Sequence, residues 1–142
     1  MHFHIRPFLT LPLAFWFLIT LLVLSSVPAY AEWVAIGESG SDGTTIYVDP
    51  DTIRRKGDLV KMWHLFDYKT AETYRGSSFL SIKAQDHYDC AEERIRSLAV
   101  VHHSGNMGIG RAVYIRSDEG NWEPVPPQST GQALWKFACD KP

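Results

Sequence analysis

The chain has 142 residues, with 14 basic and 16 acidic side chains and a formal net charge of −2 at pH 7. A slight acidic excess argues against a general binder of nucleic acids or membrane surfaces, because both need a surplus of positive charge. The length suits one domain, and the sequence has no internal repeat or linker.

The N-terminal segment is typical of a secretory signal peptide. Arg6 precedes an apolar run from Leu13 to Leu24, and the small-x-small sequence Ala29-Tyr30-Ala31 follows. The run is short for a membrane-spanning helix of ~20 residues, so we expect cleavage between Ala31 and Glu32 rather than a permanent anchor. Residues 32–142 are then the mature domain. No cysteine near the cleavage site offers a point for lipid attachment.

Most of the mature sequence predicts strands, because β-branched and aromatic residues recur in it with a period of two. The predicted strands are 32–37, 44–48, 59–68, 78–89, 92–103 and 109–116. Segment 51–56 is predicted to form a turn or a single helical turn, and the polar segment 69–77 a turn. On the fourth strand, alternation predicts an apolar face of Leu80, Ile82, Ala84 and Tyr88.

The C-terminal part changes period. The proline-rich segment 122–127 is predicted to be extended, because proline fixes φ and biases the preceding residue away from helix. Ser129 and Gln132 then match a capping box, and apolar residues follow at helical spacing through Cys139. The expected fold is therefore α+β: an antiparallel sheet of about six strands with one C-terminal helix.

Cys90 and Cys139 are the only cysteines. In an exported protein such a pair most simply forms a structural disulfide, here between the end of the fourth strand and the helix. The long loop that it closes gives roughly 4 kcal/mol of stabilisation as an upper estimate. A catalytic thiol beside His87 and a pair of metal ligands are the less favoured alternatives.

The sequence contains no arrangement of residues that marks an enzyme. It lacks a nucleophile elbow, and Gly105, Gly108 and Gly110 fit a hairpin turn better than a phosphate-binding loop. His102 and His103 should point to opposite faces of a strand, so they do not suit one zinc site. We expect no catalytic residue, no cofactor and no tightly held metal.

Candidate binding residues come from charge and position. Arg94 and Arg96 share one face of a strand, and Arg54–Lys56 form a second basic cluster. The functional interpretation is a patch that binds acidic proteins or sulfated glycans; the alternative is cross-strand ion pairing on a solvated face. Met107, in the turn after Arg94 and Arg96, and Trp122 are candidate apolar anchors.

Short segments along the whole mature chain occur in an order that resembles a known family. They include Tyr47-Val48-Asp49-Pro50, Val60-Lys61-Met62-Trp63, Tyr88-Asp89-Cys90, Ser104-Gly105-Asn106-Met107-Gly108 and Trp122…Cys139. The sequence resembles the surface-adhesin protein E family of proteobacteria. That resemblance implies a six-stranded antiparallel sheet whose C-terminal helix is held by the disulfide, and binding of host matrix proteins such as vitronectin or laminin.

The expected function is an exported, non-catalytic binding module for a protein partner. The name-giving adhesin of the family is lipid-anchored, whereas this chain has no lipidation cysteine. We therefore expect periplasmic or cell-surface localisation without a lipid anchor, and a homodimer is also considered. The alternative function is a periplasmic small-molecule-binding or enzyme-accessory protein with a pocket between sheet and helix.

Overall fold

The residues with strand-like periodicity form one antiparallel sheet in the computed structural model, which describes residues 31–140. The predicted signal peptide, apart from its last residue Ala31, lies outside the described residues. The strands are β1 (Val34–Ser39), β2 (Thr44–Lys56), β3 (Leu59–Tyr74), β4 (Ser77–Asp89), β5 (Arg94–His103), β6 (Ala112–Arg116) and β7 (Glu123–Pro124). The first six pair in chain order, and β7 pairs with β5. A short 3-10 helix, η1 (Asn106–Gly108), and the C-terminal helix α2 (Thr130–Asp140) complete the fold. The expected sheet with one C-terminal helix is confirmed.

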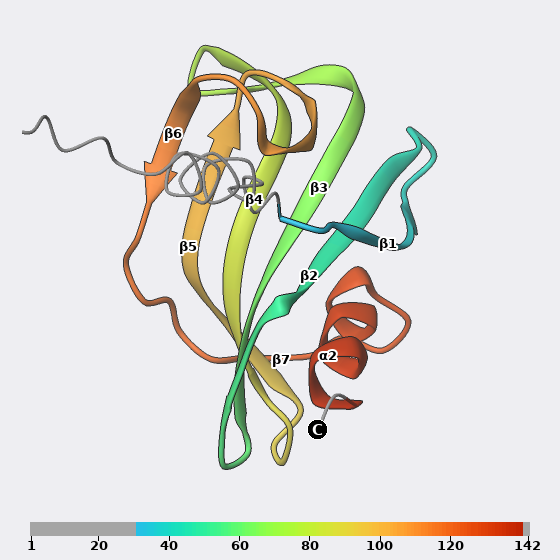
Figure 1. Cartoon of the computed structure of the whole chain (residues 1–142), viewed down its shortest axis with the longest axis vertical. Coiled ribbons are helices and arrows are strands. Elements are labelled where there is room, and N and C mark those ends of the chain that lie inside the picture. Colours follow the sequence, from blue (N-terminus) through green and yellow to red (C-terminus); the bar gives the residue numbers. More distant parts are fainter. Residues whose placement is uncertain (1–30, 141–142) are drawn as a thin grey trace, which may run out of the picture. The chain divides into compact units, whose positions relative to one another are not determined.

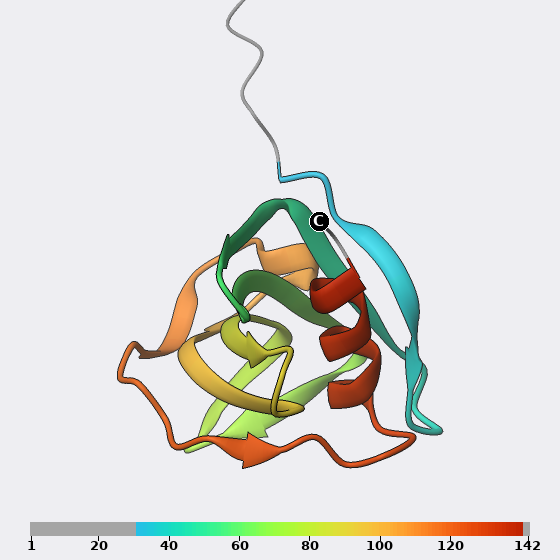
Figure 2. The same cartoon turned by 90° about the horizontal axis from the view of Figure 1, so that it is seen from below.

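The sheet is strongly curled, and α2 packs against one of its faces (Figures 1 and 2). We call this face the inner face and the opposite one the outer face. The core consists of apolar side chains of three strands and the helix: Ile46, Val48, Val60, Met62, Tyr88, Leu134 and Ala138. Within residues 31–140, no helix is long and apolar enough to cross a membrane.

Strand β2 is longer than predicted, and the expected turn over 51–56 is wrong. The chain continues past Asp49-Pro50 as a strand, with an irregularity in its pairing to β3 between Asp49 and Arg54. Proline is tolerated at such a position because its missing N–H interrupts no regular ladder bond. Thr52 Oγ1 replaces part of the ladder: it accepts from the Trp63 N–H at 3.0 Å and donates to the Asp49 carbonyl at 2.7 Å.

Strand β3 also extends beyond the prediction, to Tyr74, so the turn expected over 69–77 is much shorter. Only Arg75 and Gly76 join β3 to β4, with φ of 49° and 79°. Two successive residues with positive φ suit a tight hairpin, whose twist matches that of the flanking strands. The polar composition of this segment reflects exposure of a strand end rather than a loop.

The first half of β4 buries different residues from those predicted. Phe79 and Ser81 are buried there, rather than Leu80 and Ile82. The reason for Ser81 is the segment after β5, which folds back over the outer face: Ser81 Oγ donates to the Gly105 carbonyl at 2.6 Å and accepts from the Gly108 N–H at 2.9 Å. Tertiary hydrogen bonds thus compensate a burial that hydropathy alone does not predict.

Helix α2 begins as the capping box predicts. Ser129 Oγ accepts from the Gln132 N–H at 3.1 Å, and the Gln132 side chain accepts from the Gln128 N–H at 2.9 Å. Trp135 Nε1 donates to the carbonyl of Asp89 at 2.9 Å. The predicted Cys90–Cys139 disulfide is present, and it joins the last turn of the helix to the residue that follows β4.

Candidate protein-binding surface

Four basic residues lie side by side across the outer face of the sheet. Arg54 of β2 pairs with Lys61 of β3, Lys61 with His87 of β4, and His87 with Arg96 of β5. We call these four residues the basic row. Neighbouring strands lie roughly 4.8 Å apart, so the row extends over about 15 Å.

The alternation of side chains along each strand produces this arrangement. Lys61 lies between the buried residues Val60 and Met62, and His87 directly precedes the buried Tyr88. Because successive side chains point to opposite faces, packing these apolar neighbours on the inner face places the basic residues on the outer face. Residues of like charge directly opposite one another destabilise a sheet, so folding alone does not favour this row.

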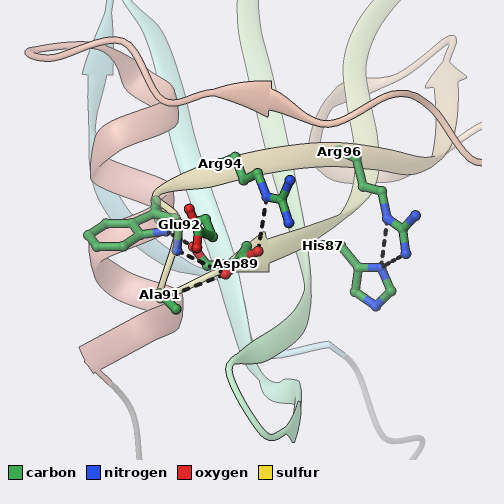
Figure 3. A network of polar contacts seen from close by, with 7 residues as sticks. His87, Asp89, Ala91, Glu92, Arg94 and Arg96 are labelled. Atoms are coloured by element: carbon green, nitrogen blue, oxygen red, sulfur yellow. Dashed lines mark hydrogen bonds and ion pairs between the residues drawn. The ribbon is translucent and has the colours of Figure 1, made fainter.

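The positive charges of the row affect the pKa of His87. Its pKa is lowered, first by burial and then by the charges of Arg96 and Lys61, while Glu119 acts in the opposite direction. The imidazole is therefore neutral at pH 7, and His87 Nδ1 accepts from Arg96 Nε at 3.2 Å (Figure 3). A neutral ring between Lys61 and Arg96 limits the repulsion within the row.

Trp122 covers the β5 end of the basic row. The guanidinium carbons of Arg94 and Arg96 lie 4.9 and 4.5 Å from the centroid of its ring, and the His87 ring stacks on it at 6.1 Å. Each cation–π contact at such a partly exposed site contributes about 0.5–1 kcal/mol. The candidate anchor Trp122 therefore fixes the two arginines in place.

The two arginines singled out from the sequence already have acidic partners. Arg94 Nε lies 3.0 Å from Asp89 Oδ2, directly across the strand pair, and Asp89 Oδ1 also accepts the N–H groups of Ala91 and Glu92 (Figure 3). Arg96 Nη2 lies 2.8 Å from Glu119 Oε1. Arg94 thus makes the cross-strand ion pair that was the alternative interpretation.

The charge available to a partner lies at the other end of the row. Within residues 31–140, Lys61 has no carboxylate partner, and the Arg54 guanidinium donates only to the carbonyls of Asp51 and Ile53, both at 2.9 Å. Both side chains are exposed. A hollow of about 430 Å³ opens here, lined by Arg54, Arg55, Lys56, Leu59, Lys61 and His87.

Met107 does not share this surface. It follows the opposite end of β5 from Arg94, and a ten-residue strand is about 30 Å long. Its side chain is half-buried, and its N–H donates to Asp67 Oδ1 at 2.7 Å. Ile109, 65% exposed, is the apolar residue that this segment presents to solvent.

Lys61 and His87 are the residues that the sequence did not single out for binding. Their strand and their alternation with buried neighbours were visible in the sequence, but the register that aligns them with Arg54 and Arg96 was not. The Arg54–Lys56 cluster was recognised, although as part of a turn. Lys61 of β3 and His87 of β4 thus connect the Arg54–Lys56 cluster with the pair Arg94 and Arg96.

The histidines form no metal site in the part of the chain that the structure describes, where no three metal-ligating side chains lie close together. His102 packs among the rings of Tyr74, Phe79 and Tyr114. His103 instead lies opposite Ser81 of the neighbouring strand β4. The expectation of no tightly held metal stays a prediction.

Residues 33–140 match the family described as Surface-adhesin protein E. The chain belongs to this family. Its structure resembles that of the selenomethionine form of Haemophilus influenzae protein E, with a TM-score of 0.59 and 11% identity over 80% of this chain and 89% of that one. A second crystal form of Haemophilus influenzae protein E gives a TM-score of 0.56 and 14% identity over 78% and 97% of the two chains. No curated protein matches the sequence. At such identities the likeness to these protein E structures concerns the fold.

Proposed function

We propose that this protein is an exported, non-catalytic binding module that holds an acidic segment of a protein partner on its basic row. The observation that carries the proposal is the alignment of Arg54, Lys61, His87 and Arg96 across four strands, with the first two exposed and without carboxylate partners in residues 31–140. Membership of a surface-adhesin family supports a protein as the partner.

The chemistry of the row favours carboxylates. The planar fork of Arg54 suits a carboxylate in two-point contact, and Lys61 adds a mobile ammonium group beside it. A partner carboxylate placed here also relieves the repulsion between neighbouring cations of the row. Exposed ion pairs contribute only ~0–1 kcal/mol each, so we expect several contacts and an interaction that weakens with salt.

Host matrix proteins such as vitronectin or laminin, the partners that the resemblance of the sequence implies, are the first candidates to test. Adhesion to them requires that the protein reach the cell surface. The signal peptide expected at residues 1–31 supports export, and the family supports a surface role. Protease treatment of intact cells distinguishes a location on the cell surface from one in the periplasm. A surface protein is digested, whereas a protein shielded inside the envelope survives and is not an adhesin.

The test of the surface is a pair of matched double variants. Arg54→Gln with Lys61→Gln removes two charges from the row, and Lys69→Gln with Arg111→Gln removes two exposed charges elsewhere. We expect the first pair to weaken binding to immobilised vitronectin or laminin about tenfold, which is about 1.4 kcal/mol, and to reduce its salt dependence. The control pair should bind as the wild type does.

Equal binding by both double variants would exclude the basic row as the binding surface. Heparin serves as a second ligand, because sulfate groups also suit arginine and lysine. Binding to heparin with no binding to any protein candidate would contradict the proposal of a protein partner.

A further inference from the structure

Two cavities open on the inner face of the sheet, and Arg96 is the one member of the basic row among their lining residues. Their volumes are about 630 and 470 Å³, and both are lined by His64, Phe66, Asp86 and Ser97. The larger one extends toward β7 and α2, and the smaller one toward the loop between β1 and β2. Each has the volume of an ordinary small-molecule site.

Asp86 lies where the two cavities meet. Its side chain is only 16% exposed, and no group in residues 31–140 donates a hydrogen bond to it. The nearest basic nitrogen is His64 Nδ1, at 3.8 Å from Asp86 Oδ2, which is too far for a hydrogen bond. A mostly buried carboxylate without a protein donor in residues 31–140, facing two cavities, is placed to pair with a group that enters them.

His64 does not supply the missing charge. It is 3% exposed, and burial lowers its pKa to about 4, so the ring is neutral at pH 7. Its Nδ1 also lies 3.4 Å from the hydroxyl of Tyr88, a buried group whose pKa is raised by burial and by Asp86. The groups packed around Asp86 from β3 and β4 are therefore uncharged at neutral pH.

The cations that line the larger cavity already have partners. Arg96 is paired with Glu119 at 2.8 Å, and Arg116 lies 3.7 Å from Asp118 and donates to Ser97 Oγ at 3.1 Å. An anionic ligand would have to compete with these carboxylates. The rims of the cavities carry two more acids, Asp42 and Glu123.

Apolar side chains form much of the wall of the smaller cavity and part of the wall of the larger one. Phe66, Ile82, Ala84 and Val100 line the smaller cavity, and Ile95 and Leu134 line the larger one. An apolar body bound here removes hydrocarbon surface from water, which stabilises a complex by about 25 cal/mol per Å² of apolar area.

We propose that this inner-face cavity binds a small amphipathic organic cation, whose protonated amine pairs with Asp86 and whose apolar body lies against Phe66 and its neighbours. Asp86 lies on the inner face, whereas the exposed Arg54 and Lys61 of the basic row lie on the outer face; of the row, only Arg96 also lines the larger cavity. The carboxylate provides the charge recognition, and the walls provide the affinity for hydrocarbon.

The environment of Asp86 gives the site a signature in pH. Burial raises the pKa of Asp86 to about 7, and the charge of Arg116 acts against this rise. The carboxylate is mostly protonated at pH 6 and mostly ionised at pH 8, while an alkylamine remains protonated at both. Pairing with the ionised form predicts that binding of a cation strengthens as pH rises.

The test is calorimetry of the exported protein with hexylammonium, hexanol and hexanoate, at pH 6 and pH 8. We expect hexylammonium to bind best, about tenfold more tightly at pH 8 than at pH 6, given a pKa near 7 for Asp86. Asp86→Asn keeps the shape but not the charge, so hexylammonium should bind it at least tenfold more weakly and without the dependence on pH. Asp51→Asn, an exposed position on β2, should bind as the wild type does.

Three results would overturn the proposal: equal binding of hexylammonium to Asp86→Asn, tighter binding of hexanoate than of hexylammonium, or no binding of hexylammonium to the wild type at either pH. The pH profile of the wild type needs no variant, so it remains decisive even if Asp86→Asn does not fold. The double variant Arg54→Gln with Lys61→Gln should leave hexylammonium binding unchanged, which separates this site from the basic row.

Discussion

His87 and Arg96 face each other across β4 and β5, and the Arg96 side chain donates to His87 Nδ1 at 3.2 Å. This hydrogen bond requires an imidazole without a proton on Nδ1. Protonation of His87 breaks the bond and also adds a charge between Lys61 and Arg96. The basic row is therefore coupled to pH at its centre.

The first prediction concerns this coupling. The pKa of His87 is lowered in the folded protein, so its contribution to stability is present above the ordinary value of 6.5 and is lost as pH falls through the folded value. His87→Gln cannot take up the proton, so we expect its melting temperature to fall less than that of the wild type between pH 7 and pH 5. Parallel melting curves for the two proteins over this range would contradict the coupling.

The disulfide gives the second prediction. Replacing both Cys90 and Cys139 by serine should lower the free energy of unfolding by about 2–4 kcal/mol, because the unfolded chain regains the entropy of a long loop. Urea denaturation of the double variant and the wild type measures the difference. A change below about 1 kcal/mol would mean that packing of α2, with the Trp135–Asp89 hydrogen bond, holds the helix without the covalent link.

Ser81 provides a third prediction. It is fully buried and bonds to both Gly105 and Gly108, so Ser81→Ala leaves a carbonyl and an N–H without this partner. We expect a loss of about 1–3 kcal/mol of stability and faster amide hydrogen exchange in the segment 104–111. Ser78→Ala, at an exposed position on the same strand, is the control and should change neither quantity.

The elements of the fold were largely predictable because they depend on local patterns. Short apolar, β-branched or alternating runs marked the six strands of the meander, and the Ser129–Gln132 capping box marked the start of α2. The two cysteines indicated the link between helix and sheet. In each case the residues that carry the signal lie within one element or have only one possible partner.

The binding surface was less predictable because it depends on register. Asp49-Pro50 signals the end of a strand, yet Thr52 lets β2 continue through an irregularity, and only this places Arg54 opposite Lys61. The site around Asp86 was likewise only partly predictable from the sequence. Its alternation places it beside Met62 on the inner face, but the cavity around it arises from segments distant in sequence.

The fourth prediction concerns the N-terminus. The apolar run followed by Ala29-Tyr30-Ala31 predicts that the exported protein begins at Glu32. N-terminal sequencing of the protein from the periplasmic or surface fraction measures this directly. Recovery of a chain beginning at Met1 would show that the segment is retained. It would then indicate a membrane-anchored protein.

The last prediction compares Asp86 with His64, which make the stability of the protein depend on pH in opposite directions. The pKa of Asp86 is raised from 3.8 to about 7, so its contribution is fully present below 3.8 and is lost as pH rises through 7. The pKa of His64 is lowered from 6.5 to about 4, so its contribution is present above 6.5 and is lost as pH falls through 4. Between about pH 4 and 6.5 the folded protein holds the proton on Asp86 and the unfolded chain holds one on His64. In this range the two contributions to the change of stability with pH therefore nearly cancel in the wild type.

Asp86→Asn removes one side of this balance, so its stability should fall on acidification where that of the wild type is flatter. One pKa unit corresponds to about 1.4 kcal/mol, so the wild type should gain at most about 4 kcal/mol relative to the variant between pH 7 and pH 4. Urea denaturation at half-unit steps of pH measures the difference, which cancels the contributions of His87 and other groups common to both proteins. Asp51→Asn should keep the wild-type profile. A difference between wild type and Asp86→Asn that does not change with pH would show that Asp86 is ionised throughout this range, and that another group neutralises it in the folded protein.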